Sequence, residues 1–180
     1  MGAGAFYSQA RTKSEGVENG FIKTTLLAMI EIIEHLKAQE LEIEVRMTEF
    51  TKDHEQVQRF QSAPGVGPMT ALAMVAVVDD INRFKNSKEF ASYLGLVPSV
   101  TASANKCMMG SITRSGSEML RRYLIHGARA WMRYSPTGDP NRAWAERVKE
   151  RRGMNKAVVA LAHRMARILY AMAKHNTAYE

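Results

Sequence analysis

The sequence has a single cysteine and no long hydrophobic run, and each absence excludes a class of protein. With Cys107 alone, the chain cannot form an internal disulfide, which suits the reducing cytoplasm. No apolar stretch approaches the roughly 20 residues that a membrane-spanning helix needs. Residues 1–20 also lack the apolar core of a signal peptide. We therefore expect a cytoplasmic protein with no membrane association, in which residues 1–20 form a disordered leader.

Glycine and proline are absent from one long segment, between Phe21 and Ala63. Apolar residues recur in this segment at seven-residue spacing: Ile22, Met29, Leu36, Ile43, Phe50 and Val57. Such a heptad pattern is typical of a coiled coil. We expect one long helix over residues 21–62 that acts as a coiled-coil arm and makes the protein a homo-oligomer. The alternative is two shorter helices that fold back on each other, with a break between Gln39 and Glu44.

Strand patterns and metal-ligand spacings are also missing. No segment alternates apolar and polar residues over the length of a strand, so the predicted class is all-α, with a compact helical domain over residues 63–180. His35 and His54 have no cysteine or second histidine at metal-ligand spacing. Asp79 and Asp80 are better explained as a capping pair. We expect no metal site and no cofactor within this chain.

Positive charge is concentrated in the second half of the chain. Residues 1–80 contain 7 Lys and Arg against 12 Asp and Glu, whereas residues 81–180 contain 18 against 6. A strongly basic half predicts a polyanionic partner. Because most of the basic residues are arginines, which bind phosphate with a planar fork of donors, nucleic acid is favoured over a membrane surface.

A glycine turn lies shortly before the basic half of the chain, in the segment Pro64-Gly65-Val66-Gly67-Pro68. Pro68 suits the first position of a helix, and the free N–H groups of that first turn attract phosphate. The pattern resembles the turn of a helix-hairpin-helix motif, which holds the DNA backbone without reading bases. The alternative is an ordinary turn that needs glycine for steric reasons. The candidate DNA contacts here are Gly65, Val66, Gly67 and Thr70.

A polar segment and an arginine-rich helix supply the other candidate contacts. Residues 99–116 are polar and small, which predicts a long functional loop, and a helix begins near Ser117. In that helix the apolar residues form one face and arginines another, a pattern that also fits a simple solvated face. We expect DNA-backbone contacts from Lys106, Arg114, Arg121, Arg122 and Arg129.

Four segments in order resemble the C-terminal half of a transposase of the insertion sequence one-hundred-and-ten family, over about residues 60–175. They are Pro64–Ala71, Phe90–Pro98, Gly110–Arg122 and Arg151–Ala157. The long helix that precedes them is similar to the coiled-coil region of that family. The resemblance implies a DNA recombinase that acts with a guide RNA, a so-called bridge RNA.

The resemblance also implies a serine nucleophile that attacks a DNA phosphate, and the matching position is Ser103. Lys106 matches the family pattern, but Ala104 and Asn105 replace its usual glycines. The family's RuvC-like acidic domain, which binds magnesium, has no counterpart in these residues. We therefore expect a truncated form, a separate short product or a fragment, unable to cut DNA alone. The alternatives are a non-catalytic helix-hairpin-helix DNA-binding or scaffolding protein and, with less support, an RNA-binding protein.

Overall fold

The structure is a computed structural model that describes residues 3–103 and 106–179, with the backbone alone described for residues 3–5, 101–103 and 106–109. It divides into two compact units, Met1–Glu49 and Phe50–Glu180, and each is described by itself. Helices dominate both units, so the predicted helical class is confirmed. Among the described helices, none is both long and apolar enough to cross a lipid bilayer.

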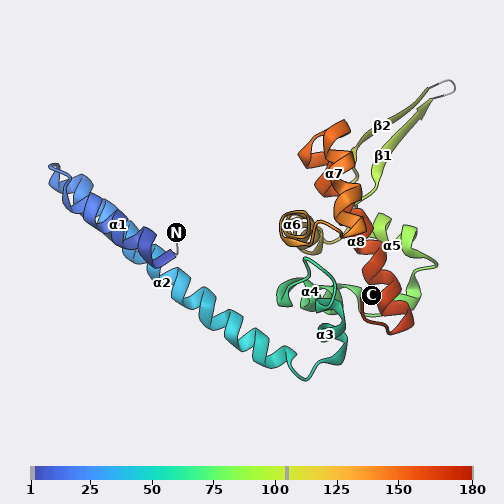
Figure 1. The fold of residues 1–180 in the computed structure, drawn as a ribbon, viewed down its shortest axis with the longest axis horizontal. Coiled ribbons are helices and arrows are strands. Elements are labelled where there is room, and N and C mark those ends of the chain that lie inside the picture. Colours follow the sequence, from blue (N-terminus) through green and yellow to red (C-terminus); the bar gives the residue numbers. More distant parts are fainter. Residues whose placement is uncertain (1–2, 104–105, 180) are drawn as a thin grey trace. The chain divides into compact units, whose positions relative to one another are not determined.

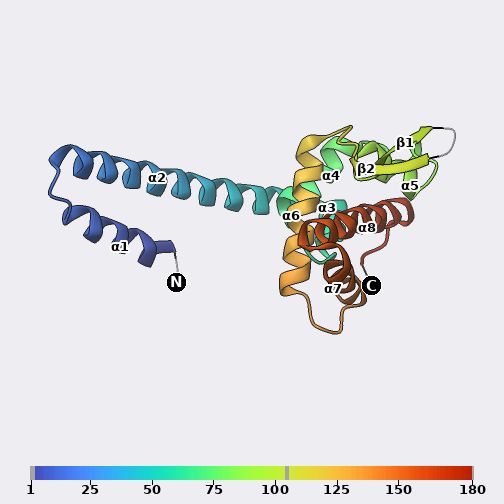
Figure 2. The ribbon, with the colours of Figure 1, turned by 90° about the horizontal axis from the view of Figure 1, so that it is seen from above.

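The first unit is built from α1 (Ala3–Glu15) and most of α2 (Gly20–Thr51), which run side by side (Figures 1 and 2). A hydrogen-bonded ion pair joins Arg11 Nη2 to Glu34 Oε2 at 2.5 Å and holds the pKa of Glu34 below its usual value. The structure differs here from the expected disordered leader, because most of residues 1–20 are helical. Little in the sequence indicates α1, since apart from Phe6 and Tyr7 its residues are small or polar and form only a weak apolar stripe.

Helix α2 is continuous, without the alternative break between Gln39 and Glu44, but it ends at Thr51. Residues 52–54 separate it from α3 (Glu55–Gln61), so the expected helix over 21–62 is two helices. The heptad residues of α2 remain exposed, including Met29 at 55% and Leu36 at 56%. Ile30, by contrast, is 8% exposed. The face of α2 that α1 covers is therefore not the heptad face.

The second unit packs around its C-terminal helix, α8 (Met154–His175), shown in red in Figure 1. This helix contacts α3, α5 (Ser87–Tyr93), α6 (Glu118–Tyr134) and α7 (Pro140–Arg152). Helix α4 (Pro68–Val78) packs on α3 and α6, and a short 3-10 helix, η1 (Ile81–Arg83), leads to α5. Fully buried side chains from these helices form one core, among them Phe90, Leu124, Trp131, Leu161 and Met165. Each contributes about 1.5–3 kcal/mol of burial free energy.

The segment expected to be a long loop forms an antiparallel hairpin of β1 (Pro98–Ser103) and β2 (Lys106–Ile112). The hairpin extends away from the helices of its unit (Figure 1). Its pairing shifts between Pro98 and Val100, where the register has a bulge or irregularity. The helical prediction missed the polar–apolar alternation from Ser99 to Ser103 in β1, which is short and made of small residues, while the residues of β2 do not alternate.

Candidate nucleic-acid interface

The glycine turn before α4 lies against the backbone of α6. Gly65 has a φ of 76°, and a Cβ atom there would lie 2.2 Å from the carbonyl oxygen of Gly127. In the opposite direction, a Cβ on Gly127 would lie 2.3 Å from the carbonyl oxygen of Gly65. No side chain fits between two backbones at that separation. The steric explanation therefore accounts for Gly65 without a phosphate.

The other residues of the turn differ in their exposure. Val66 and Thr70 are each 6% exposed, whereas Gly67 is exposed and has open space around its Cα. Gly67 is the N-cap of α4, Pro68 follows it, and the first bond of the helix runs from Ala71 N to Gly67 O. Of the four predicted turn residues, Gly67 is the most exposed, whereas Gly65 is partly buried. The amide group of Gly67 is the part of the turn that could face a phosphate.

The side chain of Arg121 is buried at the base of the hairpin, where it holds two chain segments together. The side chain is 7% exposed, and Nη1 donates hydrogen bonds to Leu94 O at 3.1 Å and to Ser115 O at 2.8 Å. Two glycines let the same chain segments approach each other closely. A Cβ on Gly95 would lie 2.5 Å from Ser115 N, and one on Gly116 would lie 1.9 Å from Tyr93 O. Arg121 therefore joins the end of α5 to the chain that follows β2, and DNA contact by this residue stays a prediction.

Arginine 114 occupies a backbone conformation that favours glycine. Its φ is 58°, and its N–H donates to Gly95 O at 3.2 Å while its side chain is exposed. A left-handed conformation costs a residue with a Cβ roughly 1–2 kcal/mol. Such outliers are concentrated at functional sites. The position thus carries a guanidinium where the backbone alone would favour glycine.

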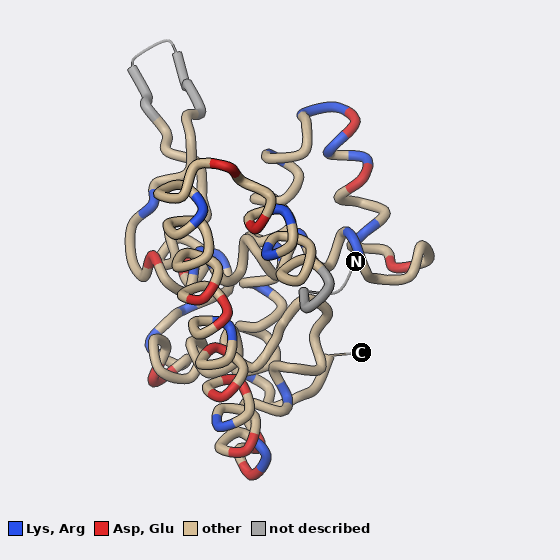
Figure 3. The backbone as a smooth tube through the Cα atoms, turned by 90° about the vertical axis from the view of Figure 1, so that its left-hand side faces the viewer, with Lys and Arg blue, Asp and Glu red and all other residues tan. Residues whose placement is uncertain are grey.

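A groove of about 1250 Å³ lies at the base of the hairpin, between α6, α7 and α8. Glu118 is the one acidic residue in its described lining. Six cationic side chains line the groove: Arg114, Arg121, Arg122, Arg129, Arg152 and Lys156. Within the described residues, no ion pair involves any of these six. Figure 3 shows how lysines and arginines are distributed along the backbone. The described lining of the groove therefore has an excess of positive charge, with Glu118 as its one acidic residue and no ion pair that neutralises the six cationic side chains.

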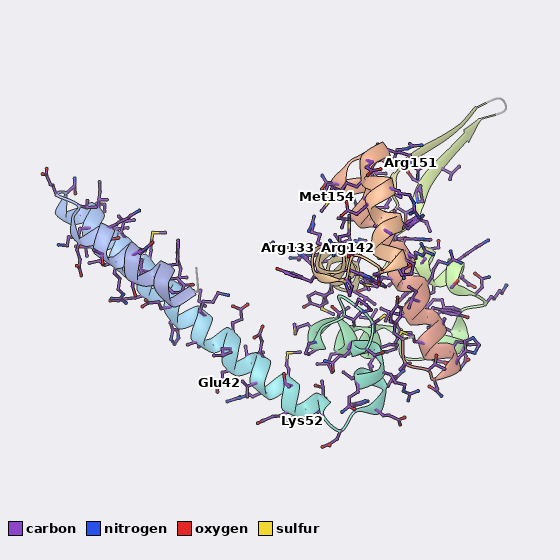
Figure 4. All side chains as sticks on the ribbon, viewed as in Figure 1. Glu42, Lys52, Arg133, Arg142, Arg151 and Met154 are labelled. Atoms are coloured by element: carbon purple, nitrogen blue, oxygen red, sulfur yellow. The ribbon has the colours of Figure 1, made fainter. Side chains whose placement is uncertain are left out.

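Sequence reasoning found part of this groove and missed part of it. Arg114, Arg122 and Arg129 were predicted contacts and all line the groove with exposed side chains. Arg152 and Lys156 were not predicted, although both lie in the fourth segment that resembles the transposases. The turn between α7 and α8 brings them there, near Arg151 and Met154, which are labelled in Figure 4.

His163 also lines the groove, from α8. Burial, and to a smaller extent the nearby charge of Arg167, lowers the pKa of His163 below its ordinary value. The imidazole is therefore neutral near pH 7 and adds no further charge to the groove. A lone histidine in a helix carries no sequence signal that would have identified this position.

Ser103 and Lys106 lie at the far end of the hairpin. The register places them directly opposite each other, as the last pair of the ladder. Their side chains, together with Ala104 and Asn105, lie outside the described residues. The structure thus positions the candidate nucleophile and the candidate cation by backbone pairing. The chemistry of their side chains stays a prediction.

The residues present do not fit the magnesium site that the resemblance implies for the acidic domain. In the described part of the chain, no three His, Cys, Asp or Glu side chains form a group that could hold a metal ion. Asp80 instead caps η1, where its side chain accepts a hydrogen bond from Asn82 N. No step of a reaction is therefore assigned to a metal held by this chain.

Comparison with known proteins shows that this sequence is similar to transposases. The model of the "Transposase IS116/IS110/IS902 family" matches residues 57–142. The chain is 43% identical over 129 residues to the transposase for insertion sequence element IS1111A of Coxiella burnetii, covering 71% of this chain and 35% of that protein. It is 33% identical over 148 residues to a probable family 20 transposase of Pseudomonas aeruginosa, covering 82% of this chain and 44% of that protein.

The chain is therefore similar to part of a transposase. Residues 57–142 match the IS116/IS110/IS902 transposase family. The chain spans less than half the length of each of these two relatives. The matched region begins within α3, includes the glycine turn, both strands of the hairpin and α4 to α6, and ends just after the start of α7.

Proposed function

We propose that this chain is the DNA-binding and strand-transfer region of an insertion-sequence transposase, acting in DNA transposition. The observation that carries the proposal is the groove, which gathers six cationic side chains at the base of the hairpin that bears Ser103. Arginine and lysine bind the phosphates of DNA, and they position the duplex without reading its sequence. The match of residues 57–142 to a transposase family supports the same interpretation.

In this proposal the Ser103 hydroxyl oxygen attacks a phosphorus atom of the DNA backbone. A bond forms between the serine oxygen and phosphorus, the bond from phosphorus to a sugar oxygen breaks, and the serine proton passes to a base. A serine needs such a base to become a nucleophile, and the transferring phosphate needs nearby positive charge. Lys106, opposite Ser103 in the ladder, is a source of that charge. In this proposal the acidic magnesium-binding domain and the guide RNA are supplied separately, and no residue is assigned as the base.

The nucleophile is tested by capturing the covalent intermediate. We expect the chain, supplied with the acidic domain, guide RNA, DNA and magnesium, to form a protein–DNA adduct that survives denaturation. Ser103→Ala should abolish the adduct, because alanine has no oxygen to bond to phosphorus, while DNA binding by the groove changes less than about twofold. Denaturing electrophoresis with labelled DNA measures the adduct, and fluorescence anisotropy measures binding.

Serine 99 provides the matched control, since it is a second serine of β1 at the base of the hairpin. Ser99→Ala should leave the adduct in place. An adduct that persists in Ser103→Ala would contradict the assignment of the nucleophile. DNA binding without an adduct in the wild type would favour the non-catalytic scaffolding protein instead.

We also propose that α2 makes the protein a homo-oligomer through its heptad face. Met29 and Leu36 are more than half exposed, although both are apolar and lie at heptad positions. A second copy of the helix would cover this face in the manner of a coiled coil. Met29→Glu with Leu36→Glu should convert the oligomer to a monomer and leave the helical circular dichroism of the second unit intact. Sedimentation equilibrium measures the mass.

The control is Gln39→Glu, which adds a charge at another exposed position of α2. This variant should keep the mass of the wild type. If the Met29 and Leu36 variant keeps it as well, the heptad face is not the interface. A wild-type protein that sediments as a monomer at micromolar concentration would also refute the proposal.

A further inference from the structure

The groove at the base of the hairpin has an apolar floor as well as a basic rim. Ile125 and Val159 line the groove and are only partly buried, so they supply the apolar surface of this floor. Leu96 and Val158 also line it, but at 2% and 1% exposure they offer almost no surface to a ligand. The cationic side chains that line it are mostly exposed. Such a recess can accept a flat apolar group between phosphates held at its edge.

An aromatic side chain lies in the same lining. Trp144 of α7 is half-buried, packs partly on the core and lines the groove. The guanidinium carbon of Arg164 lies 5.0 Å from the centre of its ring. Trp131, the other tryptophan of the chain, is 1% exposed in the core. Trp144 is therefore the tryptophan within reach of a ligand in the groove.

We propose that the groove binds an unpaired nucleic-acid strand, with its phosphates on the basic rim and a base packed on the apolar floor beside Trp144. The inference rests on the proposed function of the groove and names the form of nucleic acid that it takes. Proteins that bind single strands combine these two features, a positively charged groove and aromatic or apolar platforms for bases.

A duplex uses only half of this site. Its bases are paired and stacked on each other, so its exterior offers phosphates and sugars to a concave surface, and the apolar floor gains nothing. An unpaired strand exposes the flat faces of its bases, which stack on side chains with little regard to sequence. The groove, at about 1250 Å³, is also larger than the roughly 300–1,000 Å³ of pockets that hold one small ligand. Several nucleotides of a single strand fit that volume.

The test compares one oligonucleotide of mixed sequence, free of self-pairing, in single-stranded form and annealed to its complement. We expect the full chain to bind the single strand about tenfold more tightly than the duplex at equal salt, by fluorescence anisotropy. A ribonucleotide version of the single strand is a parallel sample. Tighter binding of either single strand than of its duplex supports the inference and shows whether DNA or RNA is preferred.

The variants separate stacking from folding. Trp144→Leu keeps an apolar side chain against the core but removes the aromatic face, and it should weaken single-strand binding about tenfold while duplex binding stays within about twofold. Trp144→Phe should bind the single strand nearly as well as the wild type. Binding of the single strand should also quench tryptophan fluorescence in the wild type but not in Trp144→Phe, whose remaining Trp131 is buried.

Each failure has its own signature. Equal or tighter binding of the duplex by the wild type would overturn the inference, and so would equal losses for single strand and duplex in Trp144→Leu. If charge reversal at Arg122 and Arg129 still weakened binding in those cases, the groove would remain the DNA site. Insensitivity of both forms of DNA to that charge reversal would instead refute the proposed function of the groove.

Discussion

Reversing two charges in the groove, Arg122→Glu with Arg129→Glu, is expected to lower the affinity of the chain for DNA by roughly 30- to 100-fold near physiological salt. Both side chains are exposed, both line the groove, and within the described residues neither forms an ion pair. Their loss should therefore leave the fold intact. The plot of log affinity against log salt should also become shallower by about two, since two phosphate contacts are lost.

The matched control is Arg133→Glu with Arg147→Glu. These arginines lie on α6 and α7, two of the helices that line the groove, and are exposed, but neither of them lines the groove. The control has the same net charge as the groove variant, so a general loss of charge would weaken both equally. We expect the control to lose less than about fivefold. Equal losses, measured by anisotropy titrations at several salt concentrations, would place the DNA elsewhere.

Adding a methyl group at the crossing of the glycine turn and α6 is expected to destabilise the second unit severely. Gly65→Ala or Gly127→Ala would place a Cβ within 2.3 Å of a carbonyl oxygen of the opposite backbone. Neither backbone can yield without moving a helix, and Gly65 also has a φ of 76°. We expect a loss of about 3 kcal/mol or more in the free energy of unfolding, or failure to fold. Urea denaturation followed by circular dichroism measures it.

Gly67→Ala is the control for the same turn. Gly67 has a φ of −87°, and nothing lies within 4 Å of a Cβ built on it. The free energy of unfolding of the Gly67→Ala variant should differ from that of the wild type by less than about 1 kcal/mol. If Gly65→Ala lowered the free energy of unfolding as little as Gly67→Ala, the close approach of the two backbones would be contradicted. A loss of DNA affinity in Gly67→Ala at unchanged stability would restore a phosphate-binding role to the turn.

The sequence predicted the helices well because their signals are local. Ser117 caps α6 by accepting a hydrogen bond from Leu120 N, and the apolar face of that helix is buried where the pattern placed it. The heptads likewise predicted α2, although the helix ends at Thr51. The hairpin was missed because its strands pair mainly with each other and need no apolar face. Helix α1 was missed because its contact with α2 depends on long-range pairs such as Arg11 and Glu34.

The candidate site was predictable only in part, for a physical reason. Periodicity shows that Arg122 and Arg129 share the polar side of a helix, and they do line the groove. Periodicity does not show which arginine meets buried carbonyl groups, and Arg121 binds those of Leu94 and Ser115. Nor does it show that the glycine at position 65 faces another glycine across 62 residues of chain. Both facts depend on tertiary packing.

The account depends most on the claim that nucleic acid lies in the groove at the base of the hairpin. The direct measurement is photo-crosslinking with benzoylphenylalanine placed at Ser111, which lines the groove and is exposed. The control position is Tyr134 at the end of α6, which is 74% exposed and outside the groove. We predict strong crosslinking of labelled DNA from position 111 and little from position 134. Crosslinking from position 134 but not from position 111 would contradict the account.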